Sequence, residues 1–334
     1  MKNPVNIITL LVLIFIAGCS GQTQEKGRQA VKIIFDTDLG PDYDDVGALA
    51  FLHAMADSGK AEILATVSSN RHELVVPSID VINTWFNRPG LPIGAPMNDG
   101  ASMGSSQHWA DSLVARYPHA IKSTSDAEDA VKLYRRILAG QPDNSVTIIT
   151  VGFLTNLRNL LQSAPDDISP LTGIQLIGKK VSNLVAMAGS FPEGREFNVY
   201  IDPAASKYVF ENWPGEVIFT GFEIGKEILT GLRVMDMPIA ESPVKDVFRI
   251  SIPLSEEDRY GRMSWDETAV LIAVYGTNGF FDTRRGTIQI DETGNNKWID
   301  NSEGKHQYVI QKMPVPEITK FIEDRMMHVP SDKQ

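Results

Sequence analysis

The amino-acid sequence predicts an α/β protein with a mainly parallel, doubly wound sheet and a small C-terminal β-hairpin extension. Apolar, strand-like runs alternate with amphipathic, helix-like stretches along most of the 334 residues. This alternation is typical of parallel strands joined by helices on both faces of a sheet. Near the C-terminus, apolar and polar residues alternate singly, which indicates antiparallel strands. No internal repeat or linker divides the pattern, so we expect one domain.

The predicted elements follow one another in a regular order from residue 31 onwards. An apolar strand at residues 31–35 leads into a helix, in which Val46, Leu49 and Leu52 have helical spacing. Further strands are predicted at residues 61–69, 145–151, 184–188 and 216–219, with a turn into a short strand at 89–94. Further helices are predicted at residues 75–86, 126–139 (with Asp126 as its cap), 154–163, 203–213 and 316–326.

Two segments depart from this alternation. Residues 98–125 are polar, rich in Gly and Ser and without a clear period, which predicts a long loop that is functional or mobile. Residues 287–291 and 307–311 flank the turn-rich segment 292–305, and this arrangement predicts the antiparallel hairpin.

The N-terminus has the features of a bacterial lipoprotein leader. Lys2 supplies a positive start, residues 7–17 are almost wholly apolar, and Ile16-Ala17-Gly18-Cys19 resembles a lipobox, in which the chain is cut before a cysteine that is then lipidated. The apolar core is too short for an ordinary spanning helix. A plain cleaved signal peptide is the alternative, but Cys19 is the only cysteine and stands at the required place.

We therefore divide the chain into a lipoprotein signal peptide (residues 1–19), a flexible tether (20–30) and a domain (31–330). This organisation predicts a protein of the bacterial cell envelope that is attached to a membrane by a lipid anchor, on its periplasmic or surface face. Because the net charge is −11, nucleic acid is not an expected partner. With Cys19 as the only thiol, neither disulfides nor cysteine-ligated zinc contribute to the domain. A homo-oligomer is compatible with the sequence, which does not define the oligomeric state.

The strongest functional signal is a cluster of five aspartates directly after the first strand: Asp36, Asp38, Asp42, Asp44 and Asp45. They lie on a strand-to-helix turn, and the carboxyl ends of parallel strands usually open into a ligand crevice. Carboxylates packed this closely repel one another, and a hard cation bound by oxygen offsets the repulsion. The cluster therefore predicts a metal-binding turn.

Two other interpretations of this turn are weaker. An EF-hand requires Gly and Glu at the sixth and twelfth loop positions, where this chain has Pro41 and Gly47. A phosphatase of the haloacid dehalogenase type would use Asp36 as nucleophile and require magnesium. In that motif a small hydroxyl residue or Val stands where this chain has Gly40. The phosphatase stays open as an alternative.

The acid turn also resembles the signature of the inosine–uridine-preferring nucleoside hydrolases. The matching pieces are Asp36-Thr37-Asp38-Leu39-Gly40 and Asp44-Asp45, separated by two more residues than in the commonest family spelling. Four later blocks resemble the family in the same order: Asn70, Val151-Gly152-Phe153-Leu154-Thr155-Asn156, Glu196-Phe197-Asn198 ahead of Asp202-Pro203, and Trp265-Asp266. We interpret Thr155, Asn156 and Asp202 as helix caps.

The resemblance implies a calcium site. Asp38, Asp45 and Asp266 would bind the ion through their side chains, and Val151 would contribute its backbone carbonyl. Because that ligand is a carbonyl, Val in place of the family's Thr leaves the site intact.

The resemblance also implies a base for the attacking water. Asp44, paired with a ligand on the same turn, would accept the proton from the calcium-bound water. Asp36 would support the ligands from behind. Asp42 lies in the two-residue extension and would compete with Asp44 for the role of base.

Contacts to the substrate are implied less completely. Asn70, Glu196 and Asn198 would bind ribose hydroxyls. Trp265 stands where many family members have His, the acid for the leaving base, so it would stack on the base or pack beside it. His108, in the long polar segment, is a candidate for the missing acid.

Taken together, the resemblance implies a hydrolase that cleaves the N-glycosidic bond of ribonucleosides or related small-molecule ribosides by means of a calcium-bound water. Two alternatives from other classes stay open. One is a catalytically impaired, lipid-anchored ribosyl-binding protein, and the other is the phosphatase.

Overall fold

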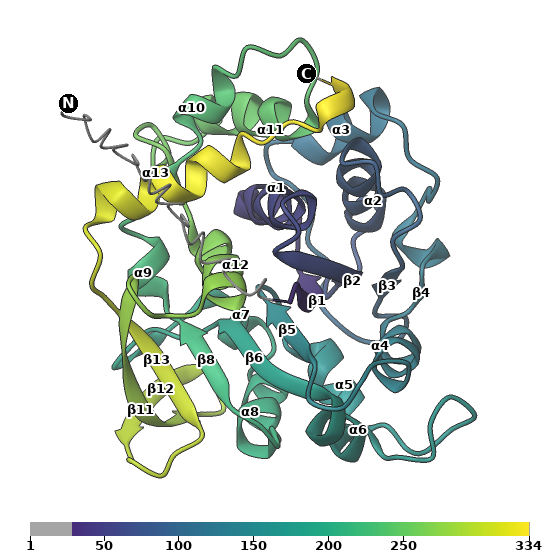
Figure 1. Ribbon diagram of the computed structural model, residues 1–334, viewed down its shortest axis with the longest axis vertical. Helices are drawn as coiled ribbons and strands as arrows, with labels where there is room; N and C mark the ends of the chain where they lie inside the picture. Colours follow the sequence, from purple (N-terminus) through teal and green to yellow (C-terminus); the bar gives the residue numbers. More distant parts are fainter. Residues whose placement is uncertain (1–28, 334) are drawn as a thin grey trace, which may run out of the picture.

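The computed structural model describes residues 29–333 (Figure 1). The predicted signal peptide, Cys19 and residues 20–28 of the tether lie outside the described residues. Within residues 29–333, no helix combines the length and the apolar character that crossing a membrane requires.

An eleven-stranded sheet organises the described chain, in the order β4-β3-β2-β1-β5-β6-β8-β13-β11-β12-β7. The pairs from β4 to β13 are parallel, and those from β13 to β7 are antiparallel. The predicted α/β class with a mainly parallel sheet is therefore confirmed. The strands are β1 Val31–Thr37, β2 Ala61–Ser68, β3 Ile93–Ala95, β4 Glu128–Asp129, β5 Val146–Thr150, β6 Val181–Met187, β7 Glu193–Arg195, β8 Val217–Thr220, β11 Phe281–Ile290, β12 Asn295–Asp300 and β13 His306–Gln311, with a separate pair β9 Leu229–Thr230 and β10 Arg262–Met263.

Helices cover both faces of the sheet (Figure 1), and an apolar core lies beneath each layer of helices. Successive residues of β1 point to opposite faces, so Ile33 and Phe35 join one core and Ile34 joins the other. One layer contains α1 Asp44–Asp57, α2 Val75–Trp85, α3 Trp109–Arg116, α11 Pro243–Ser251, α12 Trp265–Tyr275 and α13 Val315–Met326. The other contains α4 Ala130–Ala139, α5 Thr155–Gln162, α6 Gly173–Lys180 and α8 Pro203–Asn212. The remaining α-helices are short: α7 Phe197–Ile201, α9 Phe222–Gly225 and α10 Leu232–Met235.

The C-terminal extension is larger than the predicted hairpin. β12 lies within residues 292–305, which we predicted as turn, and β11 pairs with both β12 and β13. Asn296 and Trp298 of β12 point inward, but the Asn and Gly residues around them have the composition of a turn. Because β13 also pairs with β8, the extension continues the main sheet.

The prediction of a continuous loop over residues 98–125 is wrong. It contains α3, whose Trp109 and Leu113 are fully buried. The predicted cap of the following helix is also wrong. Asp126 ends a short 3-10 helix, and α4 is capped by Asp129, whose side chain accepts from the Lys132 backbone N–H.

Candidate active site

The acid turn lies where the strand order of the sheet reverses. β2, β3 and β4 follow on one side of β1, and β5 and β6 follow on the other, which is the usual place for a ligand crevice in such sheets. A pocket of about 230 Å³ opens there. Its lining includes Asp38 after β1, Val151 after β5 and Met187 at the end of β6.

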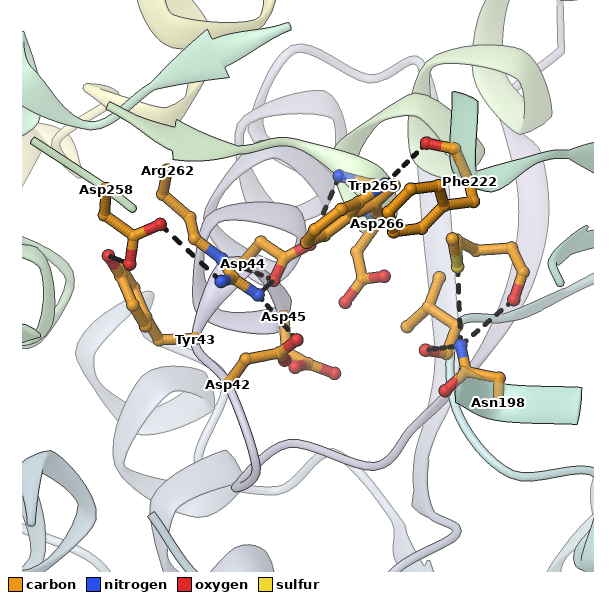
Figure 2. Close-up of polar contacts among 12 residues, drawn as sticks. Asp42, Tyr43, Asp44, Asp45, Asn198, Phe222, Asp258, Arg262, Trp265 and Asp266 are labelled. Carbon is orange, nitrogen blue, oxygen red and sulfur yellow. Dashed lines mark hydrogen bonds and ion pairs between the residues drawn. The ribbon is translucent and has the colours of Figure 1, made fainter. Parts of the chain in front are cut away.

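Two helices that begin at this pocket carry carboxylates in their first turns. α1 begins at Asp44 and Asp45, and α12 begins at Trp265 and Asp266. The positive end of a helix dipole stabilises carboxylates at these positions. The two helices bring Asp45 and Asp266, which are 221 positions apart in sequence, to the same site (Figure 2).

Arg262, which the sequence analysis missed, is the central cation of the site. Its Nε and Nη2 donate to Asp44 Oδ1 at 3.0 and 2.7 Å, and Nη2 also donates to Asp42 Oδ2 at 2.5 Å (Figure 2). Nη1 lies 3.8 Å from Asp258, which accepts a hydrogen bond from the Tyr43 hydroxyl. The guanidinium therefore holds the two-residue extension of the turn against β10.

Asp44 has partners on both carboxylate oxygens, which argues against its predicted role as the base. Oδ1 accepts from Arg262, and Oδ2 accepts from the backbone N–H groups of Trp265 and Asp266 at 3.2 and 3.4 Å. Burial raises the pKa of Asp44 to about 6, although Arg262 opposes the shift. With both oxygens committed, Asp44 ties α1 to the start of α12. We therefore correct its role from base to positioning residue.

Asp38, Asp45 and Asp266 are three carboxylates of the site that Arg262 leaves without a counter-charge. Asp45 Oδ1 accepts from the Thr37 hydroxyl, but the buried Oδ2 has no partner among the described residues. No other described residue hydrogen-bonds to the side chain of Asp38 or Asp266. Burial and the neighbouring carboxylates raise the pKa of all three groups well above the usual range.

These three residues are the side chains predicted to bind calcium, and their chemistry fits a cation. A buried carboxylate oxygen without a donor is costly, and a hard cation would satisfy it. The carboxylate oxygens that lie within a few ångströms of one another belong to another set of residues than the three predicted ligands. Among the described residues, Asp42, Asp44 and Asp45 have ligand atoms within 4.8 Å of one another, but Asp42 and Asp44 already face the guanidinium.

The backbone at the end of β5 closes the inner side of the pocket. The Val151 carbonyl accepts from Asn198 Nδ2 at 3.0 Å, and the same amide donates to the Met187 carbonyl at 3.1 Å. A Cβ at Gly152 would lie 2.4 Å from the Asp38 backbone nitrogen, so only glycine allows this approach to the acid turn. The predicted carbonyl ligand and Asn198 therefore both lie at the pocket.

Glu196 also lines the pocket, as a buried carboxylate held by backbone donors. Oε1 accepts from Asn198 N–H at 2.7 Å, and Oε2 accepts from Gly189 and Val199 at 3.0 and 3.2 Å. Burial raises the pKa of Glu196 to about 7, although these donors oppose the shift. The three N–H groups fix Glu196 as an acceptor that faces the pocket.

Asp36 lies behind the turn, within β1, and does not line the pocket. Oδ2 accepts from the Tyr134 hydroxyl at 2.7 Å and from Asn156 Nδ2 at 3.1 Å. This position agrees with the predicted supporting role and is unsuitable for a nucleophile. The predicted cap role of Asn156 is wrong because its amide braces Asp36. Asp202 does cap a helix, since its side chain accepts from the first turn of α8.

The outer part of the pocket is aromatic. Trp265 and Phe222 have nearly parallel rings 5.2 Å apart, and Trp265 Nε1 donates to the Phe222 carbonyl at 2.8 Å (Figure 2). Met263 and the exposed Glu257 complete this outer ring. Of these four residues the sequence analysis identified only Trp265. The others follow no motif and become neighbours only in the fold.

Comparison with known proteins tests the family that the sequence resembles. The family model described as "Inosine-uridine preferring nucleoside hydrolase" matches residues 33–317. The chain belongs to this nucleoside hydrolase family. A Leishmania major protein of the same description is 25% identical over 287 residues, which cover 79% of this chain and 84% of that protein. The pyrimidine-specific ribonucleoside hydrolase RihA of Klebsiella pneumoniae is 25% identical over 193 residues, or 55% of this chain and 58% of that protein.

Solved nucleoside hydrolase structures share the fold. A plant nucleoside hydrolase, PpNRh1, superposes with a TM-score of 0.68 at 18% identity, covering 89% of this chain and 99% of that one. The inosine-uridine preferring nucleoside hydrolase of Bacillus anthracis superposes with a TM-score of 0.65 at 15% identity, also covering 89% of this chain and 99% of that one. As a member of this family, the chain is an N-ribosyl hydrolase. The family model and all of these relatives and structures are nucleoside hydrolases, and none of them supports the phosphatase alternative.

One substrate contact implied by the family resemblance lies elsewhere in this nucleoside hydrolase. Asn70 does not line the pocket. Its Nδ2 donates to the carbonyls of Asp38 and Met103, and its Oδ1 accepts from the N–H groups of His72 and Met103. Because these backbone partners use the whole amide, Asn70 fixes the turn instead of a ribose.

His108 is not at the pocket either. Its side chain is 81% exposed and lies 3.4 Å from Asp111, at the start of α3. Since the long segment folds into a helix instead of hanging over the crevice, the prediction that His108 is the leaving-group acid is wrong.

Proposed function

We propose that this nucleoside hydrolase cleaves the N-glycosidic bond of ribonucleosides or related ribosides with calcium bound at the acid turn. The observation that carries the proposal is Asp45 Oδ2, which is fully buried and has no hydrogen-bond partner among the described residues. Arg262 neutralises Asp42 and Asp44 but leaves Asp45, and with it Asp38 and Asp266, without a cation.

Calcium would be held by Asp38, Asp45 and Asp266 together with the Val151 carbonyl. Oxygen ligands of this kind, with room for water and hydroxyl groups, are what calcium prefers. When bound, such an ion lowers the pKa of a coordinated water and orients the hydroxyls of a sugar.

We assign the role of base to Asp38. Asp38 lines the pocket, and within residues 29–333 no other residue hydrogen-bonds to its carboxylate, whereas Asp44 and Asp42 are both engaged by Arg262. As water adds to the anomeric carbon, Asp38 accepts its proton. The sugar becomes oxocarbenium-like in the transition state, and the anionic lining stabilises that charge.

The ribose hydroxyls would face Glu196 and Asn198. The Glu196 carboxylate accepts three N–H groups but retains lone pairs toward the pocket, so it would also accept from a hydroxyl group. The side-chain carbonyl oxygen of Asn198 accepts from no donor in the described part of the chain, because the contacts of this side chain go through its Nδ2.

The test compares Asp38→Asn with Asp42→Asn, using release of reducing sugar from purine, pyrimidine and nicotinamide ribosides with and without chelator. Because Asp38 is also a proposed calcium ligand, both variants are measured at saturating calcium and their calcium content is determined. With calcium retained, turnover of Asp38→Asn should still fall by roughly two to four powers of ten, the usual contribution of a positioned general base. Asp42→Asn should cost much less, because Asp42 is partly exposed and ion-paired. Normal turnover of Asp38→Asn, with calcium content and ribose-analogue binding intact, would show that another group is the base.

We also propose that the protein is anchored to a bacterial membrane through a lipid on Cys19. The proposal is supported by the lipobox-like Ile16-Ala17-Gly18-Cys19. Cells that express the full chain should hold it in the membrane fraction, and Cys19→Ser should release it. Retention of Cys19→Ser after washing without detergent would contradict the anchor.

A further inference from the structure

The pocket has a buried inner part and an exposed outer part with different chemistry. The inner carboxylates Asp38, Glu196 and Asp266 are at most 4% exposed, whereas Glu257 and Phe222 of the outer ring are exposed. The groups proposed to bind ribose lie in the inner part. A riboside bound there would therefore direct its base toward the outer ring.

The outer ring offers a flat surface to a planar base. The rings of Phe222 and Trp265 are inclined by only 26°, and the hydrogen bond from Trp265 to the Phe222 carbonyl fixes their relation. This aromatic pair already accepts cations of the chain itself. The Arg262 guanidinium lies 5.1 Å from the Trp265 ring centre, and the ammonium of Lys226 lies 5.9 Å from that of Phe222.

The charge of the pocket also favours a cation. Six carboxylates and one guanidinium line it, so the formal charge of the lining is negative even when a divalent cation is counted. The guanidinium, Arg262, is itself neutralised by Asp42, Asp44 and Asp258. Glu257, at the outer ring, has no hydrogen bond or ion pair with any described residue.

The lining also lacks the residue types that most often protonate a leaving base. Among the described residues that line the pocket there is no His, Lys, Tyr or Cys, and Glu196 is held as an acceptor by three N–H groups. A neutral purine or pyrimidine leaves as an anion unless it gains a proton. A base that already carries a positive charge leaves as a neutral molecule.

We propose that this pocket selects ribosides whose base carries a fixed positive charge, such as an N-ribosylpyridinium or an N7-alkylated purine riboside. Glu257 would face the charge of the base, and Phe222 and Trp265 would contact its ring. The C1′–N bond breaks with its electron pair passing to the nitrogen, which neutralises the base. Water supplies the new C1′–O bond, and its proton goes to Asp38. No proton has to reach the leaving group.

This inference rests on the proposed function, and the test separates the two. The kcat/KM values of the calcium-loaded full chain are compared for 7-methylguanosine and guanosine, which differ by one methyl group and its charge. The charged substrate should be cleaved faster. Because it is also the more reactive compound, the deciding measurement is the ratio of the two values in matched variants.

Glu257→Gln should lower the ratio of charged to neutral kcat/KM about fivefold, the size expected for one charge pair near 4 Å in water. Phe222→Leu should lower it in the same direction. Glu256→Gln is the control, because Glu256 is an exposed neighbour that pairs with Arg259 and does not line the pocket. Its ratio should equal that of the parent chain.

Equal or faster cleavage of guanosine, or an equal loss for both substrates in Glu257→Gln, would overturn the charge selectivity and leave the proposed function intact. If neither substrate nor any other riboside releases ribose, the proposed function itself fails.

Discussion

Replacing Arg262 by methionine should destabilise the protein strongly, because the change leaves buried carboxylates without their cation. The Arg262 side chain is 10% exposed, and its partners Asp44 and Asp258 are each 2% exposed. Removal of one partner of a buried ion pair typically costs about 3–5 kcal/mol in the free energy of unfolding. We expect a loss in this range, since methionine fills most of the volume of the side chain without replacing any of its hydrogen bonds.

The assay is urea unfolding at constant calcium, with Arg284→Met as the matched control. Arg284 pairs with Asp300, but these side chains are 52% and 57% exposed, so its loss should cost less than about 1 kcal/mol. The double variant Arg262→Met/Asp44→Asn should recover part of the loss, with a coupling of roughly 0.5–3 kcal/mol. If Arg262→Met were no less stable than Arg284→Met, the reasoning about the buried charge would be refuted.

Three further measurements test other parts of the structure. Gly47→Ala should cost about 1–3 kcal/mol of stability by overpacking, because its Cβ would lie 2.1 Å from Glu267 Oε1. Gly140→Ala, whose nearest atom would be 3.6 Å away, should leave urea unfolding nearly unchanged. His53 is buried and its pKa is lowered to about 3, chiefly by burial, so the unfolded chain binds an extra proton below its ordinary pKa of 6.5. The contribution of His53 to stability should therefore fall by up to about 1.4 kcal/mol per unit as pH drops from 6 to 4, and an identical pH dependence of stability in the parent chain and in His53→Gln would contradict this. Calcium at 100 times its Kd should raise the free energy of unfolding by about 2.7 kcal/mol, and an unchanged urea midpoint after chelation would count against the metal site.

Much of the fold could be predicted because each central strand is rich in apolar and β-branched residues. Residues 61–69 and 145–151 were predicted within one residue at either end of β2 and β5. The predicted bounds of α8 and α13 also lie within one residue of the observed bounds, because a capping Asp202 marks the start of α8 and a Pro marks the start of α13. The errors lie where polar composition conceals regular structure. In α3 only one face is buried, and Trp109 and Leu113 belong to that face. Because this short helix lies in a segment that is otherwise polar and rich in Gly and Ser, the segment has the composition of a loop.

The inner site was also predictable, because its ligands come from compact motifs at the ends of strands and helices. Asp38, Asp266, Val151, Glu196 and Asn198 all line one pocket. The roles within the cluster were not predictable, since they depend on which partner each carboxylate meets.

Arg262 is the clearest case of a site residue that the sequence conceals. It lies only four residues before Asp266, but nothing in its local sequence indicates that it reaches the acid turn. One signal was available: five aspartates on one turn need more positive charge than a single divalent cation supplies.

The hydrogen bond between Arg262 and Asp44 joins residues that are 218 positions apart, and this separation bears on the order of folding. The strands β1, β2 and β5 come from the first half of the chain and can pair before the second half is made. The pocket cannot form until α12 packs against α1, because Asp44 receives its donors from there. Long-range contacts of this kind form slowly, since the intervening chain must first be ordered. On the ribosome, binding competence would therefore be among the last properties that the growing chain acquires.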